Sequence, residues 1–289
     1  MAHGKLPAWL TVPLAFGGFL LLNWLERRQP LRRRTQSKVE REIRNIAVGG
    51  LGAVAVQLTE IPLVLSLFES TELQRWGILT RLSLPVWFEL PMALLLMDYT
   101  YYVWHILLHR VPLLWRFHLV HHVDLDMDKS TALRFHFGEV LLTLPFRVAQ
   151  VVLIGLTPLT YSVWQICFLL SIMFHHSDLE LPLQWERRLN RFIVTPRMHG
   201  IHHSIARQET ESNWSSGLTI WDRLHGTLRL NVPQREITVG VPGWRTPDSV
   251  KLSKILVLPF QTLPPVWQLP GDGEPAPHVA ESPRDHLLP

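Results

Sequence analysis

Histidine is the residue type in this chain whose number and spacing point to chemistry. The 289 residues include 15 histidines, and most of them lie between positions 105 and 225. Eight fall in one HxxxH motif and two HxxHH motifs: His105, His109, His118, His121, His122, His199, His202 and His203. Spacings of three and four residues place side chains on one face of a helix. Neutral imidazole is the commonest metal ligand, so the eight suit two metal ions with about four nitrogens each.

The three motifs together are more specific than any one of them. A single HxxxH pair at the end of an apolar helix is more often packed than bound to metal, but packing alone does not predict two HxxHH motifs. Imidazole ligands suit iron, zinc, copper or nickel. The HExxH helix of zinc proteases is absent from the sequence, and so are the paired Glu-x-x-His motifs of soluble di-iron bundles. The single cysteine, Cys167, excludes an internal disulfide and a cysteine-based metal site.

Composition favours a membrane protein. Hydrophobic residues make up 47% of the chain and charged residues 18%, against about 25% charged in an average soluble domain. Trp is enriched at membrane interfaces, and the chain has 12. The net charge is +4, and the basic residues lie beside apolar runs. This placement indicates contact with an anionic membrane surface, and no nucleic-acid partner is expected.

Four apolar stretches are expected to position the histidines. Residues 7–25 are uncharged and long enough to span a bilayer, with a signal peptide as the alternative. Residues 45–68 and 84–108 form the next two runs. Residues 139–176 make either two passes or a re-entrant hairpin, broken at Thr157-Pro158. A dense group of basic residues follows the first run and places that loop in the cytoplasm: Arg27, Arg28, Arg32, Arg33, Arg34, Lys38, Arg41 and Arg44.

This topology brings every histidine motif to one side of the membrane. The third run ends at the cytoplasmic face with His109, and the fourth returns His175 and His176 to the same face. We therefore predict an all-α integral membrane protein with about four to five hydrophobic helices. A cytosolic helical cap is expected to carry the histidine-rich metal site.

The same segments predict the domain organisation. We expect residues 1–91 to form an N-terminal transmembrane region and residues 92–230 to form the catalytic domain. Residues 231–289 are expected to be a C-terminal extension. Its Pro-rich end, from Pro264 to Pro289, is typical of a disordered tail.

The order HxxxH, HxxHH, HxxHH resembles the fatty acid hydroxylase and sterol desaturase superfamily of membrane di-iron oxygenases. The resemblance covers roughly residues 92–230, and the three-residue gap in the first motif favours this family over the acyl-CoA desaturases. It extends to the segments that flank the motifs: Asp98-Tyr99-Thr100-Tyr101-Tyr102, Arg110-Val111-Pro112-Leu113-Leu114-Trp115-Arg116-Phe117, Leu133-Arg134-Phe135-His136, Thr195-Pro196-Arg197-Met198 and Trp221-Asp222-Arg223-Leu224.

The resemblance implies two further ligand candidates. His136 matches the family's single histidine after the second motif, where it either binds metal or positions a ligand. His176 matches a His-Ser-Asn segment, whereas packing is the favoured role of its neighbour His175. The chain departs from the family at Asp178, where Asn is usual, and at His225, where Phe is usual.

Two carboxylates are candidate catalytic residues. Asp98 lies about two helical turns before His105, and an ionisable group inside a span is a functional candidate. Its alternative role is a structural hydrogen bond to a Tyr or Trp. Glu139 follows His136 by three residues and is expected to orient that ring through its second nitrogen, or to stabilise the start of a helix.

The resemblance implies an oxidoreductase that holds two Fe ions, with O2 as co-substrate. It would hydroxylate or desaturate an unactivated C–H bond of a lipid such as a sterol or fatty acyl chain. No GxGxxG motif or cysteine cluster is present, so the electron donor is expected to be external, of the cytochrome b5, ferredoxin or rubredoxin type. We expect a multi-pass protein of a bacterial inner membrane with a cytoplasmic active site.

Two other classes remain as alternatives. One is a membrane zinc hydrolase, in which one zinc with an open position activates water. The other is a non-enzymatic metal-binding or transport protein. Transporter ligands are expected near the bilayer midplane, whereas these histidines lie at the ends of spans.

Overall fold

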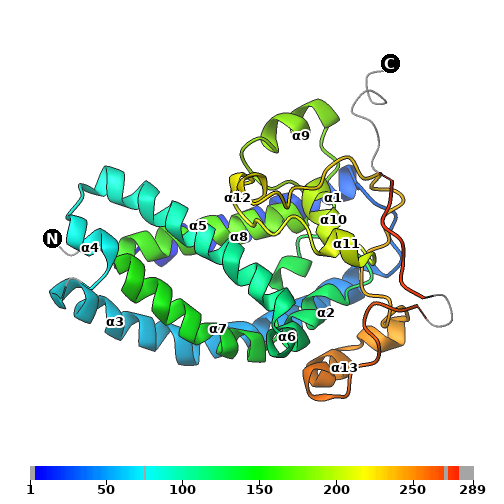
Figure 1. Ribbon diagram of the computed structural model, residues 1–289, viewed down its shortest axis with the longest axis horizontal. Helices are drawn as coiled ribbons and strands as arrows, with labels where there is room; N and C mark the ends of the chain where they lie inside the picture. Colours follow the sequence, from blue (N-terminus) through cyan, green and yellow to red (C-terminus); the bar gives the residue numbers. More distant parts are fainter. Residues whose placement is uncertain (1–3, 75, 270–272, 280–289) are drawn as a thin grey trace.

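The structure is a computed structural model that describes residues 4–74, 76–269 and 273–279. Within these ranges the chain is helical, and its only β-type pairings are isolated bridges. The all-α prediction is therefore confirmed. The long helices run along the length of the molecule, and the short ones other than α4 gather towards one end (Figure 1). The long helices are α1 (Ala8–Arg28), α2 (Lys38–Ala55), α3 (Ile61–Gln74), α5 (Val86–Arg110), α7 (Phe137–Gln150) and α8 (Pro158–His176). The short helices are α4 (Ile78–Leu82), α6 (Pro112–His122), α9 (Leu183–Leu189), α10 (Pro196–His202), α11 (Arg207–Thr210), α12 (Ile220–Leu224) and α13 (Leu252–Val257).

Four helical stretches are long and apolar enough to cross a membrane. They are Ala8–Arg28, Lys38–Phe68, Phe137–Gly155 and Pro158–His176. The second joins α2 to α3 through the π-helix η1 (Val56–Glu60), and the third ends in another π-helix, η3 (Val151–Gly155). Of the two topologies predicted for residues 139–176, the helices favour two passes.

The break between α7 and α8 follows from local sequence. Thr157 caps α8, because its hydroxyl accepts a hydrogen bond from the backbone N–H of Thr160 and the Thr160 hydroxyl accepts from Thr157. Pro158 occupies the first helical position, where its missing N–H costs nothing. Gly155 precedes them with a φ of +79°, a conformation that glycine adopts without strain.

The expected third span, residues 84–108, forms a helix but is not among the four candidate spans. Helix α5 has 25 residues, which is long enough, but its acidic residues and tyrosines make it less apolar. The polar content of α5 is explained by its position, because the helix ends at the histidine cluster and contacts α6 and α8. Polar side chains on α5 are therefore held against protein.

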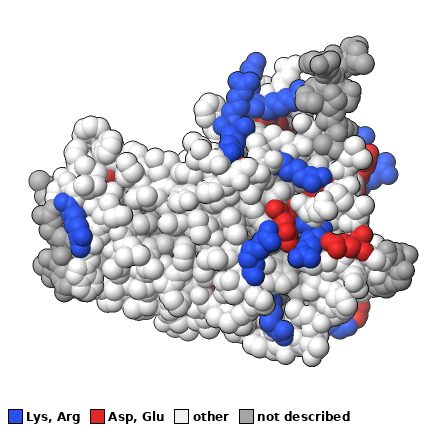
Figure 2. All heavy atoms as spheres, viewed as in Figure 1, with Lys and Arg blue, Asp and Glu red and all other residues white. Residues whose placement is uncertain are grey.

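Charged side chains are unevenly distributed over the molecule. They gather at the end that carries α9 to α13, whereas the surface over the long helices is mostly uncharged (Figure 2). An uncharged belt beside a charged end is the arrangement expected of a helical membrane protein with a polar cap.

Part of the basic segment after α1 has an internal role that the sequence did not reveal. Arg41 is 3% exposed and its Nη1 lies 2.8 Å from Oδ2 of Asp124. Lys38 Nζ lies 2.9 Å from Oε2 of the fully buried Glu26. These residues hold the loop after α6 in place, whereas Arg27 and Arg28 are exposed. Only such exposed members are free to meet a membrane surface.

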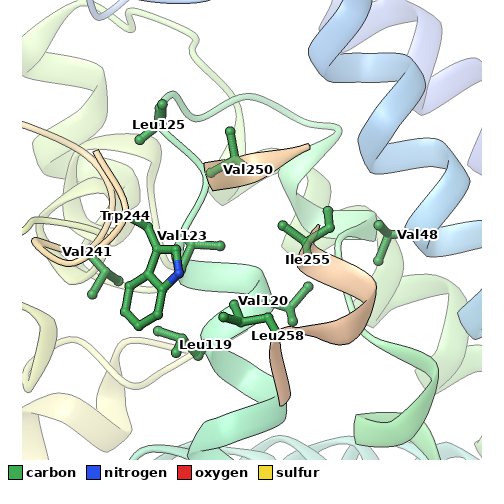
Figure 3. Packing of buried hydrophobic residues seen from close by; sticks show 10 residues of the cluster. All are labelled: Val48, Leu119, Val120, Val123, Leu125, Val241, Trp244, Val250, Ile255 and Leu258. Carbon is green, nitrogen blue, oxygen red and sulfur yellow. The ribbon is translucent and has the colours of Figure 1, made fainter. Parts of the chain in front are cut away.

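The C-terminal extension packs on α2 and α6. Val250 and Ile255 are fully buried, and both belong to a cluster with Val120 of α6 and Val48 of α2 (Figure 3). Trp244 completes the cluster from the same extension. This segment therefore covers the back of the helix that carries the second histidine motif.

Within the segment expected to form a disordered tail, the described residues contact the rest of the protein. The backbone N–H and Nδ1 of His278 lie 2.8 and 2.9 Å from the buried carboxylate of Glu209. The His278 carbonyl accepts a hydrogen bond from Arg229. Val266 also packs against the cluster that contains Ile255, and the Trp267 ring stacks on Trp115. Residues 280–289 lie outside the described ranges.

Replacing Ile255 by alanine is expected to lower the free energy of unfolding by about 2–5 kcal/mol, because it leaves a cavity behind α6. Thermal unfolding in detergent, followed by circular dichroism, measures the change. The exposed Val257 one half-turn away is the matched control, since Val257→Ala removes little buried surface. Equal melting temperatures for the two variants would contradict this role of the extension.

Candidate metal centre

Eight buried or half-buried histidines form two groups at the charged end of the molecule. In each group four ring nitrogens, one from each histidine, lie within 4.8 Å of one another. The first group contains His105, His109, His122 and His202. The second contains His121, His176, His199 and His203.

Each HxxHH motif contributes to both groups. His121 and His122 are consecutive on α6 but belong to different groups, and so do His202 and His203 at the end of α10. Consecutive residues on a helix point about 100° apart, so each pair diverges towards two centres. The rings of His122 and His203 still stack, with centroids 4.4 Å apart, so the two groups are adjacent.

A row of backbone carbonyls fixes the orientation of three rings. The carbonyls of Ser212, Trp214 and Ser216 lie 2.8, 2.8 and 3.1 Å from Nδ1 of His202, His105 and His175, respectively. The three acceptors are two residues apart in sequence, so the single segment 212–216 holds three histidines. Because each Nδ1 donates its proton to a carbonyl, each Nε2 is left with a free lone pair.

The carbonyl row is itself held by two carboxylates. Asp222 is fully buried and accepts hydrogen bonds from the backbone N–H of Trp214 and Ser215, at 2.9 and 3.0 Å. Asp98 accepts from the backbone N–H of Leu218 and from Nε1 of Trp221, at 2.9 and 2.7 Å. The structure therefore places Asp98, a predicted catalytic residue, on the supporting backbone rather than against the histidines.

Glu139 orients a different histidine from the one predicted. Its Oε1 lies 3.0 Å from Nδ1 of His118, whereas its hydrogen bond to His136 joins the two backbones. His118 belongs to neither group of four, but its ring lies 4.9 Å from those of His109 and His122. Its Nε2 is buried without a hydrogen-bond partner.

His175 stands beside the second group much as His118 stands beside the first. It is fully buried, and its ring centroid is 4.0 Å from that of His199. Its Nε2 is buried without a hydrogen-bond partner. The sequence favoured a packing role for His175. It could not show that the Ser216 carbonyl binds Nδ1 and so turns Nε2 towards the cluster.

His136 is not brought to the cluster. Its Nδ1 accepts a hydrogen bond from the backbone N–H of Gly138 and caps α7, and its Nε2 lies 3.1 Å from the carbonyl of Leu256. Both ring nitrogens are thus engaged, which leaves none for a metal. His136 lies beside the C-terminal extension, and the sequence motif alone does not predict this position.

The two departures from the family pattern lie at the edge of the site. Asp178 accepts a hydrogen bond from the backbone N–H of Arg32 at 2.9 Å, which joins the end of α8 to the segment after α1. His225 is exposed, and its ring stacks on Tyr102 with centroids 5.1 Å apart. Neither residue replaces a member of the two groups.

The electrostatics of the cluster favour neutral imidazoles. Burial lowers the pKa of His202 to about 3. Burial, and then the neighbouring histidines, lower the pKa of His122 and His203 well below the usual value. Nε2 of His176 lies 3.0 and 3.1 Å from Nε2 of His121 and His199. Ring nitrogens this close, in neutral rings with several unpartnered neighbours, fit a bound cation.

A third cluster of acidic groups does not share this character. Glu26, Glu42 and Asp128 lie close enough to surround a metal, but the cluster already holds a cation. Nζ of the fully buried Lys129 contacts Glu42 and lies 3.4 Å from Glu26. Lys38 also pairs with Glu26, and Asp128 pairs with Arg41, so basic side chains neutralise the carboxylates.

The fold and the site define a helical membrane protein with two buried groups of histidines that could hold metal. Comparison with known proteins identifies the family. Residues 90–227 match the fatty acid hydroxylase family model, and all eight motif histidines fall within this range. Residues 90–227 thus form a fatty acid hydroxylase domain.

Three relatives illustrate the range of the superfamily. A cholesterol 25-hydroxylase-like protein of Danio rerio is 32% identical over 149 residues, which are 50% of this chain and 56% of that protein. The ornithine lipid hydroxylase OlsE of Rhizobium tropici is 30% identical over 161 residues, 55% of this chain and 47% of that protein. Alkylglycerol monooxygenase of Xenopus tropicalis is 29% identical over 149 residues, 48% and 29% of the two chains. The chain thus spans about half the length of the first two, and no solved structure matches it.

Proposed function

We propose that the protein is a membrane-bound di-iron oxygenase that hydroxylates an unactivated C–H bond of a lipid. The observation that carries this proposal is the pair of buried four-histidine groups inside a fatty acid hydroxylase domain. Relatives named as hydroxylases and monooxygenases of a sterol, an ornithine lipid and an alkylglycerol support a lipid substrate. Two irons bound there would activate O2 for C–H oxidation, with the two electrons per turnover delivered by an external donor.

The protein's own contribution is to fix the ligands before metal binds. His105 and His202 would bind through Nε2, because the carbonyl row holds their Nδ1 protons. His118 and His175 have free Nε2 atoms and would complete the two sites as fifth ligands or as nearby bases. Glu139 fixes the orientation of the His118 ring through its hydrogen bond to Nδ1.

A cavity of about 600 Å³ between α2, α5, α7 and α8 is the proposed substrate chamber. Its lining includes Phe135, Glu139 and Ile172, each of which touches the histidine cluster. The Phe135 ring stacks on His121 with centroids 4.8 Å apart, Glu139 bonds to His118, and the Ile172 carbonyl bonds to His176. A lipid chain there would approach the metals from the membrane side.

The proposal extends to orientation and electron supply. The charged end of the molecule would face the cytoplasm of a bacterial cell, because the exposed arginines after α1 follow the positive-inside pattern. Electrons would come from an external donor of the cytochrome b5, ferredoxin or rubredoxin type. A donor could approach the charged end of the molecule while the lipid stays in the bilayer.

The test combines metal analysis with isotope labelling. Purified protein reconstituted with ferrous iron should bind two irons per chain and, with isotopically labelled O2 and reductant, place the label in a lipid alcohol. His118→Ala should lower the rate, whereas His225→Phe, outside the cluster, should not. One zinc per chain, with full hydrolytic activity in the absence of O2, would instead favour a hydrolase and overturn the proposal.

A further inference from the structure

A charged pair is buried in the membrane half of the molecule, away from the histidines. Nε of Arg147 lies 3.3 Å from Oε1 of Glu60, with 7% and 9% of the two side chains exposed. Tyr161 donates a hydrogen bond to Glu60, and the Arg147 guanidinium lies 4.4 Å from the centroid of the Trp164 ring. Both charged residues lie in candidate membrane spans. Ionisable residues at such depth are costly and usually serve a function.

The pair lies in the wall of the substrate chamber, at its far end from the metal centre. Glu139 and Arg147 both line the chamber, and eight residues of α7 separate them, or about 12 Å along the helix axis. The same separation holds on α8 between Ile172, beside His176, and Trp164, beside Arg147. The chamber therefore has a metal end and a polar end.

The local backbone supports a ligand-binding role for the polar end. Glu60 closes the π-helix η1, and π-helical turns inside α-helices occur frequently at functional sites. Gln57 of the same turn and Gln165 of α8 also line the chamber. Their side chains are neutral donors and acceptors and add to the hydrogen-bonding capacity of this end.

The charge balance at the polar end selects the kind of group that fits. Arg147 is already compensated by Glu60, so a carboxylate or phosphate would bring an unpaired negative charge into a region of low dielectric. A hydroxyl brings no net charge, and it can accept from the guanidinium while it donates to a carboxylate or amide oxygen.

We propose that Glu60 and Arg147, with Gln57 and Gln165, form a subsite for a neutral hydroxyl group of the substrate. The substrate class is then a lipid alcohol with an apolar body, whose oxidised carbon lies at the opposite end from the hydroxyl. This inference rests on the proposed function, because it assigns the chamber to the substrate. It makes the pair specificity-determining for the site of oxidation.

The test compares alcohols with the corresponding hydrocarbons. Binding of octadecanol and octadecane, and of a sterol with one ring hydroxyl and its parent sterane, is measured on the purified full chain in nanodiscs. The variant Glu60→Leu/Arg147→Met/Tyr161→Phe removes the polar groups together, so no buried charge is left unpaired. Cys167→Ala, on the exposed face of α8, is the control, and unchanged metal content shows that each variant folds.

The wild type and the control are expected to prefer the alcohol of at least one pair by about tenfold or more, the worth of a hydrogen bond to a charged group. The triple variant should bind alcohol and hydrocarbon alike. No preference in the wild type, a preference that persists in the triple variant, or tighter binding of octadecanoate than of octadecanol would overturn the proposal. Because binding is measured without turnover, this result is independent of whether the protein oxidises lipids.

Discussion

Replacing His203 by alanine is expected to remove one of two bound metals. The rate of lipid oxidation should fall by about 100-fold or more, which exceeds the loss caused by changing a supporting residue. The neighbouring substitution, His202→Ala, should empty the other group. The reason is geometric, since the two consecutive histidines belong to different groups of four. Metal stoichiometry by mass spectrometry and the rate of product formation measure both effects.

A double substitution sharpens this test. If the two groups are separate centres, His202→Ala with His203→Ala should leave less metal than either single variant. His136→Ala serves as the comparison, because both nitrogens of that ring are engaged by the protein. Loss of metal from His136→Ala equal to that from His203→Ala would contradict the assignment of the groups.

Replacing Asp222 by asparagine is expected to weaken metal binding by about 10- to 100-fold without removing a ligand. The two carboxylate oxygens accept hydrogen bonds from two backbone N–H groups and from the hydroxyl of Thr227. An amide presents one oxygen and one NH2, so a donor must face a donor and the 212–216 segment must shift. The three histidines that rely on its carbonyls would lose their orientation.

The matched control is Asp248→Asn, which changes an exposed carboxylate paired only with Lys251 and Lys254. It should leave metal affinity unchanged. The thermal stability of the metal-free proteins separates the two roles of Asp222, because a loss of affinity larger than the loss of stability indicates a positioning role. Unchanged metal affinity in Asp222→Asn would rule that role out.

The sequence predicts the parts of the centre that depend on local spacing. The HxxxH and HxxHH motifs place their rings on helix faces, and the apolar runs bring the motifs to one end of the bundle. Their partition into two groups was not predictable. It depends on how α6 and α10 face one another, and no property of His121 or His122 alone assigns either to a group.

The supporting structure was the less predictable part. The sequence predicts Asp98 and Glu139 as candidate catalytic carboxylates, but their hydrogen-bond partners come from other segments. Asp98 binds backbone 120 residues away, at Leu218. The 212–216 segment has no motif, because its contribution is made by carbonyls that every residue possesses. Tertiary contacts of this kind leave little trace in a single sequence.

The carbonyl row has a consequence for how this centre tolerates mutation. A ligand orientation set by side chains is lost with one codon change, but Ser212 and Ser216 accept through main-chain oxygens, so their side chains can vary while the acceptors stay. The centre is instead sensitive to substitutions at positions that determine the path of the main chain. Gly217 is one of these, because a β-carbon there would lie 2.3 Å from Oδ1 of Asp98. Inherited variation should therefore accumulate at the serines and be purged at the glycine.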